Sequence, residues 1–277
     1  MNIAEEIGVM AQDPKKKSGL LVRVISALVM LPVAIWIILN GGLPLFILIS
    51  ILMVIILYEW NGICEAKPFS GIFVVQTICA LFILIQQSFA SPYLIHITIG
   101  SVIAIGVASF LFKSKMSWAL MGFFYALVPS ISVFLIYENG DALVVLWMMI
   151  LIWSMDTGAY FAGKKIGGPK MAPKISPNKT WSGLIGGTIL AMLLGYAFVI
   201  YTEASNIPFS QDALILLILS GFLAILSQIG DLAESAVKRK FSVKDSGAII
   251  PGHGGIMDRV DGLLFVAPTI AIISYLI

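Results

Sequence analysis

Four acidic residues near the C-terminal end of the 277-residue chain have types and spacing that suit metal-dependent chemistry. Asp231 and Glu234 lie three residues apart, and Asp258 and Asp261 repeat that spacing. On a helix, residues three apart share a face, so each pair would present two carboxylates together. If the preceding apolar helix continues past Gly230, one face carries positions i, i+3, i+4 and i+7, namely Asp231, Glu234, Ser235 and Lys238. Mg²⁺ takes one or two carboxylates and completes its coordination with substrate phosphates and water. The pattern therefore favours a divalent cation with a phosphorylated substrate over a solvated loop with incidental ion pairs.

A glycine-rich turn and several cations lie between the two acid pairs. The turn reads Pro251-Gly-His-Gly-Gly255, and its backbone N–H groups could approach phosphate oxygens closely. Lys238, Arg239 and Lys244 would offset the repulsion between the acids and a nucleotide. His253 leaves two roles open: it could bind a phosphate or donate a proton, or it could hold the turn by one hydrogen bond.

A second polar cluster begins with Asp156 and continues through residues 163–183. An ionisable residue inside an apolar segment is costly and is by default a functional hypothesis, and a helix-packing role for Asp156 is the alternative. The glycines and lysines that follow, with the hydroxyls of Ser176 and Thr180 at a helix start, suit phosphate binding. No Walker-type GxxxxGK[ST] loop is present. A basic cytoplasmic loop would explain the lysines alone, but not the Ser176–Thr180 cluster.

The segments that must position these clusters are long and apolar. Hydrophobic residues make up 59% of the chain and charged residues 12%, about half the charged fraction of a soluble domain. A spanning helix needs about 20 apolar residues, and no strand-like alternation is seen. We therefore expect an all-α, polytopic integral membrane protein with about nine transmembrane helices. The expected spans are 24–40, 43–58, 70–88, 93–112, 120–137, 143–162, 184–201, 213–229 and 263–277.

The charges segregate completely when nine spans are assumed. All 17 Lys and Arg residues fall on the side of the N-terminus and of segments 59–69, 113–119, 163–183 and 230–262. The opposite side carries four acids and no base. The positive-inside rule then predicts a cytoplasmic N-terminus and cytoplasmic polar clusters, as in a bacterial inner (plasma) membrane.

Other features restrict the class of protein further. The net charge of +2 gives no general field for nucleic acid. Cys64 and Cys79 lack the spacing of a metal site and are interpreted as apolar fillers. His96, inside the fourth expected span, is interpreted as an interior polar residue. We find no internal repeat and no soluble domain.

The clusters resemble a known family. The stretch Ser235-x-x-Lys-Arg-x-x-x-x-Lys-Asp-x-x-x-x-x-Pro-Gly-His-Gly-Gly-x-x-Asp-Arg-x-Asp261 is similar to the signature of phosphatidate cytidylyltransferases. The stretches 156–163 and 176–183 are similar to other conserved regions of that family, although Ser182 stands where the family commonly has Glu. Residues 1–140 resemble the family in hydropathy alone.

The resemblance implies an enzyme that makes CDP-diacylglycerol and pyrophosphate from CTP and phosphatidate. It further implies Mg²⁺, leaves open a second cation such as K⁺, and implies a homodimer. Asp231, Asp258 and Asp261 would hold the metal. The expected catalytic residues are Asp231, Asp258, Asp261, Lys238, Arg239 and His253. The expected substrate-binding residues are Asp156, Lys164, Ser176, Asn178, Lys179, Thr180, Lys244, Gly254, Gly255 and Arg259.

The domain organisation follows from where these motifs lie. We expect one transmembrane catalytic domain over 1–277, with N-terminal helices in 1–140 and the motif-bearing half in 141–277. Two other functions stay open from the residues alone. A CTP-dependent polyprenol-type kinase is disfavoured only by the signature, and a transporter using Asp156 would usually show repeat symmetry. A CDP-alcohol phosphotransferase would need a DGxxAR-type motif, which the chain lacks.

The charge segregation makes a testable prediction of topology. Single cysteines at Asn139 and Ser114, in a background without Cys64 and Cys79, should react oppositely with an impermeant thiol reagent added to intact cells. Asn139 should be labelled because its segment is expected outside, and Ser114 should be protected until the membrane is opened. Equal labelling of the two positions would contradict the assignment.

Overall fold

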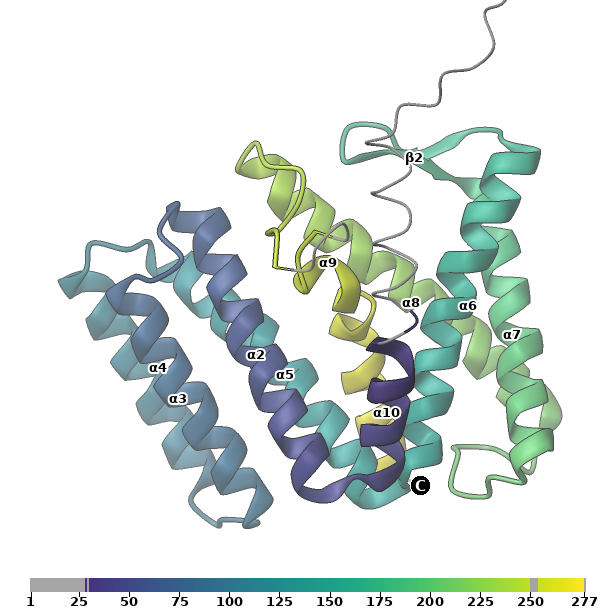
Figure 1. Cartoon of the computed structure of the whole chain (residues 1–277), viewed down its shortest axis with the longest axis horizontal. Coiled ribbons are helices and arrows are strands. Elements are labelled where there is room, and N and C mark those ends of the chain that lie inside the picture. The colour runs from purple at the N-terminus through teal and green to yellow at the C-terminus, as the bar shows by residue number, and fades with distance from the viewer. Residues whose placement is uncertain (1–27, 29, 250–253, 277) are drawn as a thin grey trace, which may run out of the picture.

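The computed structural model describes residues 28, 30–249 and 254–276. Helices make up most of it (Figure 1). The long helices are α2 (Gly42–Glu65), α3 (Gly71–Ser88), α4 (Leu94–Leu111), α5 (Met116–Gly140), α6 (Ala142–Ile166), α7 (Trp181–Thr202) and α8 (Ala213–Lys240). The remaining elements are a helix at Met30–Asn40, strands β1 (Lys170–Ala172) and β2 (Ser176–Thr180), and helices α9 (Met257–Val260) and α10 (Leu263–Leu276).

The apolar helices correspond one to one with the nine expected spans. Among the described residues, 7 helices, α2 to α8, are long and apolar enough to cross a membrane. Met30–Asn40 and Leu263–Leu276 are apolar but shorter. Helices satisfy every backbone hydrogen bond within one segment, which lipid requires because it offers no partners. The prediction of a polytopic helical membrane protein is confirmed, and the count of nine spans stays a prediction.

The expected spans are too short at the helix ends that carry polar residues. α2 runs on to Glu65, and α8 continues through Lys240, so residues assigned to connections are helical. Part of the segment 163–183, expected as a loop, instead forms an antiparallel hairpin in which Lys170 pairs with Thr180 and Ala172 with Ser176. The expected spans end where polar residues begin, but a helix can extend past the apolar core of the bilayer into water.

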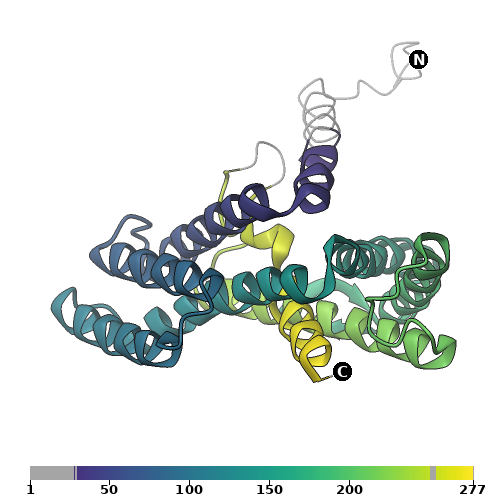
Figure 2. The same ribbon diagram turned by 90° about the horizontal axis from the view of Figure 1, so that it is seen from below.

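The helices form groups around a central set. α3 and α4 pack together at one edge, α6 and α7 at the other, and α5, α8 and α10 lie between them (Figure 1). Figure 2 shows the helix Met30–Asn40 projecting from the layer formed by the others. Backbones approach very closely between α6 and α7, where a Cβ atom on Gly158 would lie 2.8 Å from the Gly187 Cα. Small residues allow such contacts between membrane helices.

The close packing of α6 and α7 brings the hairpin to the same end of the molecule as α9 and the C-terminal end of α8 (Figure 1). The connection between α7 and α8 lies at the opposite end. Arg239 on α8 donates from Nε to the Ile175 carbonyl in the hairpin at 3.1 Å. Both polar clusters recognised in the sequence therefore meet at one end of the helix bundle.

Candidate active site

One face of α8 carries the polar residues expected from the sequence. Because α8 is continuous to Lys240, Asp231, Glu234, Ser235 and Lys238 fall at i, i+3, i+4 and i+7. The Ser235 hydroxyl donates to Asp231 Oδ1 at 3.3 Å. Glu234, Ser235 and Lys238 are buried. The predicted shared face is confirmed.

The hairpin supplies a cation to this face. Lys179 Nζ lies 2.5 Å from Asp231 Oδ2, joining the first polar cluster to the second. Thr180, the next residue, caps α7 by accepting the Gly183 N–H at 3.1 Å. This confirms the expected hydroxyl at a helix start for Thr180. The same expectation for Ser176 is wrong, because Ser176 begins strand β2.

Lys238 lies between two carboxylates. Its Nζ donates to Glu234 Oε1 at 2.9 Å and also contacts Asp258 Oδ1. The Tyr125 hydroxyl, from α5, donates to the other Glu234 oxygen at 3.2 Å. Glu234 is fully buried, so these partners satisfy an acid that would otherwise be very unfavourable in this position.

Asp258 is held on its other oxygen by backbone and hydroxyl donors. Its Oδ2 accepts from the Ser246 N–H at 3.0 Å, the Ser246 hydroxyl at 3.0 Å and the Gly255 N–H at 3.2 Å. Burial opposes ionisation, but the Lys238 ammonium and the Ser246 N–H outweigh it and lower the pKa of Asp258 to about 2. Asp258 is therefore an anion at any physiological pH.

Asp261 lies at the junction of α9 and α10 and faces a surplus of negative charge. Burial and the neighbouring Asp231, Glu234 and Asp156 raise its pKa to about 9. The junction packs tightly on α8, since a Cβ atom on Gly230 would lie 2.4 Å from the Asp261 carbonyl oxygen. The acids of both polar clusters therefore converge on one region.

The expected metal acids fit a hard cation in their chemistry, but their side chains do not form a ligand shell. Within the described ranges, no three His, Cys, Asp or Glu side chains are placed to hold a metal ion together. Asp231 and Asp258 instead contact Lys179 and Lys238, so ammonium groups meet the oxygens that would face a cation.

Most of the other expected substrate-binding residues surround this region. Asp156 is exposed on α6, and its charge interacts with those of Asp231, Lys179 and Arg259. Gly255 is buried beside Asp258, and Gly254 has a positive φ of 85°. His253 lies outside the described residues.

The remaining expected residues are less closely tied to the acids. Lys164 is exposed and lies over the Tyr160 ring, 5.5 Å from its centroid. Asn178 and Lys244 are exposed, and Ser176 is half-buried in β2. Ser182, where the family commonly has Glu, lies 3.1 Å from the Thr180 hydroxyl and donates to the Gly167 carbonyl.

Three residues of the site were missed in the sequence. Tyr125 and Glu59 come from the N-terminal half, and Ser246 from the signature segment itself. Glu59, on α2, is buried and accepts from the N–H groups of Ile256 at 2.9 Å and Met257 at 2.8 Å. The available signal is an acid directly after the apolar run 43–58, at the start of the segment 59–69 that is expected to be a connection.

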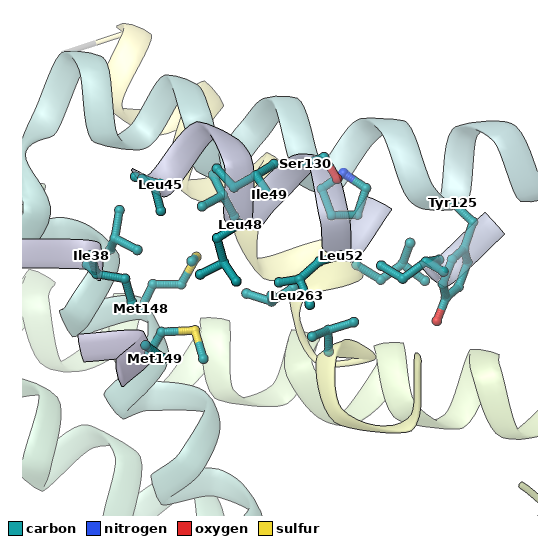
Figure 3. A pocket seen from close by; sticks show the side chains of 17 residues that line it. Ile38, Leu45, Leu48, Ile49, Leu52, Tyr125, Ser130, Met148, Met149 and Leu263 are labelled. Atoms are coloured by element: carbon teal, nitrogen blue, oxygen red, sulfur yellow. The ribbon is translucent and has the colours of Figure 1, made fainter. Parts of the chain in front are cut away.

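An apolar cavity adjoins the acidic region. It lies among the helix Met30–Asn40, α2, α5, α6 and the start of α10, with Tyr125 at one end and Ile38 and Met148 at the other (Figure 3). Val260 and Leu263, which flank Asp261 and Gly262, line it as well. The cavity therefore connects the interior of the bundle with the residues around the acids.

Comparison with known proteins agrees with the resemblance noted in the signature. The sequence model described as "Cytidylyltransferase family" matches residues 21–277. The phosphatidate cytidylyltransferase of Brucella suis biovar 1 (strain 1330) is 38% identical over 263 residues, which cover 90% of this chain and 91% of the relative. That of Staphylococcus aureus (strain COL) is 35% identical over 260 residues, covering 91% and 98%.

The double contact of Lys238 generates a prediction about stability. Lys238→Met should destabilise the protein by about 3–5 kcal/mol, because it leaves two carboxylates without their shared cation. Adding Glu234→Gln should recover much of that loss, since it removes one of the two charges. Thermal unfolding in detergent measures both variants. A double variant no more stable than Lys238→Met would contradict the pairing.

Proposed function

Because the chain belongs to the cytidylyltransferase family, we propose that it transfers the cytidylyl group of CTP to phosphatidate, giving CDP-diacylglycerol and pyrophosphate. The observation that carries this proposal is the identity of 38% and 35% to phosphatidate cytidylyltransferases over about nine-tenths of the chain. The convergence of two polar clusters at one end of a helical bundle supports it. The protein is then an enzyme of phospholipid biosynthesis.

The orientation and location follow from the charge segregation. The relatives named above are bacterial, and every Lys and Arg falls on one side of the expected spans. We place the protein in the bacterial inner (plasma) membrane, with the acidic region facing the cytoplasm, where CTP is available. The family resemblance also supports a homodimer.

The reaction requires positioning and charge neutralisation. A phosphate oxygen of phosphatidate attacks the α-phosphorus of CTP, the bond from that phosphorus to the bridging oxygen breaks, and pyrophosphate leaves with the electron pair. The attacking phosphate is already an anion at neutral pH, so no strong base is needed. Lys179, Lys238 and Arg239 would hold phosphate groups near the acids and offset their charge. Arg259, Lys164 and Lys244 would extend this basic surface.

A divalent cation suits the chemistry of the three acids, although their side chains do not form a ligand shell together in the described ranges. Asp231, Asp258 and Asp261 would hold Mg²⁺, which supplies positive charge to the phosphate oxygens of CTP when bound. Lys179 and Lys238, which contact Asp231 and Asp258, would add positive charge beside the same phosphate groups. The resemblance to the family also leaves room for a second cation such as K⁺.

The apolar cavity suits the lipid substrate. Its lining is almost wholly hydrophobic, and it reaches Val260 and Leu263 beside Asp261. An acyl chain of phosphatidate in the cavity would lie beside the acids, with the phosphate group towards Lys238. Burial of each methylene contributes about 0.8 kcal/mol, so the cavity would help to orient the lipid.

The reaction is tested by following the phosphorus atoms of CTP. Purified protein with phosphatidate and Mg²⁺ should move label from the α-phosphate of CTP into an organic-extractable lipid. Label in the γ-phosphate should leave as pyrophosphate, because the bond cut lies between the α and β phosphorus atoms. Chelation of Mg²⁺ should stop both. Transfer of γ-label into lipid would show a kinase, and no transfer of either label would contradict the proposal.

The proposed metal ligands are tested by isosteric substitution. Asp231→Asn and Asp258→Asn should each reduce turnover by more than about 10²–10³-fold, the cost of losing one good electrostatic contact to a transition state. Both should still insert and fold, which size-exclusion chromatography in detergent measures. Asp245→Asn is the matched control, because Asp245 lies in the same connection but is exposed. Near-normal turnover in either variant would remove that acid from the metal site.

A further inference from the structure

Glu59 is a buried acid from the N-terminal half that the reaction described above does not use. Its side chain is 2% exposed, near the end of α2. A buried carboxylate is costly unless its oxygens are fully hydrogen-bonded. Its donors are two backbone N–H groups, from Ile256 and Met257, and the Ser246 hydroxyl at 2.9 Å. All three belong to the segment that carries Asp258.

The two backbone contacts fix the residues that immediately precede Asp258. Glu59 Oε1 accepts from Ile256 and Oε2 from Met257, so both oxygens are engaged and the carboxylate cannot rotate without losing a bond. The turn lies very close to it, since a Cβ atom on Gly255 would be 2.6 Å from Glu59 Oε2 and 1.9 Å from Ser246 Oγ. Glu59 therefore sets the path of the backbone into α9.

The Ser246 hydroxyl connects Glu59 to Asp258 directly. Its oxygen lies 2.9 Å from Glu59 Oε2 and 3.0 Å from Asp258 Oδ2. The two carboxylates share the single proton of this hydroxyl group. The hydroxyl therefore sets the distance between Glu59 Oε2 and Asp258 Oδ2. Asp258 Oδ2 also accepts two backbone N–H groups, from Ser246 and Gly255. That oxygen is consequently fixed, and Oδ1 is the one that faces Lys238.

We propose that Glu59 is a positioning residue for cytidylyl transfer, acting through Ser246 and the turn before α9 to hold the Asp258 carboxylate against Lys238, the lysine proposed to hold the phosphate groups. The inference rests on the proposed function, because it concerns the rate of that reaction. Glu59 itself touches no substrate. A positioning role differs from a packing role because it changes the rate of the chemical step. A displacement of about 1 Å in a group at the reaction site can cost about 10²-fold in rate.

The variant Glu59→Gln tests this inference. An amide keeps the size of the side chain but presents an NH₂ group to an N–H donor, so one of the backbone contacts is lost. We expect kcat to fall about 10–100-fold while KM for phosphatidate changes less than threefold, and the Mg²⁺ concentration for half-maximal rate to rise. Glu65→Gln, at the last residue of the same helix, is the matched control and should behave as the wild type.

A second variant keeps the inference testable if Glu59→Gln does not fold. Ser246→Ala removes the shared hydroxyl but leaves both backbone contacts of Glu59, and it should lower kcat and raise the Mg²⁺ requirement in a folded protein. Glu59→Asp, which retains the charge, should recover part of the rate lost in Glu59→Gln.

The outcomes separate the positioning role from the proposed function. An active wild type together with unchanged kcat and Mg²⁺ dependence in Glu59→Gln, or in Ser246→Ala if only that variant folds, would overturn the positioning role alone. A loss that only matches the fraction of unfolded protein would overturn it too. A folded wild type without cytidylyl transfer would overturn the proposed function, and the positioning role with it.

Discussion

Lys238 contacts Glu234, one turn earlier on α8, and Asp258, which lies beyond the connection between α8 and α9. This double contact is the constraint on which the arrangement of the site depends. Two buried or half-buried carboxylates at the end of a bundle repel each other, and a shared ammonium group allows both to stay close. Because Glu234 also accepts from Tyr125, the same pair links α8 to α5. A substitution of Lys238 would therefore disturb contacts in α8, in the segment that carries Asp258, and in α5.

The N-terminal helices supply residues to the site in addition to forming expected membrane spans. Glu59 from α2 holds the turn before α9, and Tyr125 from α5 satisfies Glu234. The hairpin between α6 and α7 brings Lys179 to Asp231. Three separate segments thus converge on the acids of α8 and on the turn before α9. Such convergence suits phosphoryl-type chemistry, in which catalysis comes mainly from positioned charges.

The boundary between lipid and water at this end of the bundle explains how a small polar region could bind a nucleotide and a lipid. Lipid offers no hydrogen bonds, so the polar groups gather at one end of the bundle and satisfy one another. The apolar cavity reaches those groups, since Val260 and Leu263 form part of its lining. A soluble nucleotide and a membrane lipid could therefore meet at this boundary without either substrate leaving its own solvent.

The sequence alone determined the features that depend on local spacing. Long apolar runs predicted the helices, and the i, i+3, i+4 and i+7 positions predicted the shared face of α8, because helix geometry fixes which neighbours meet. It did not show the hairpin or Glu59. The Glu59 carboxylate and the Ser246 hydroxyl are 187 residues apart in the chain, and no local pattern indicates such a contact. Tertiary packing decided which partner each acid has, since a carboxylate on one helix can meet any cation or donor that another segment brings within reach.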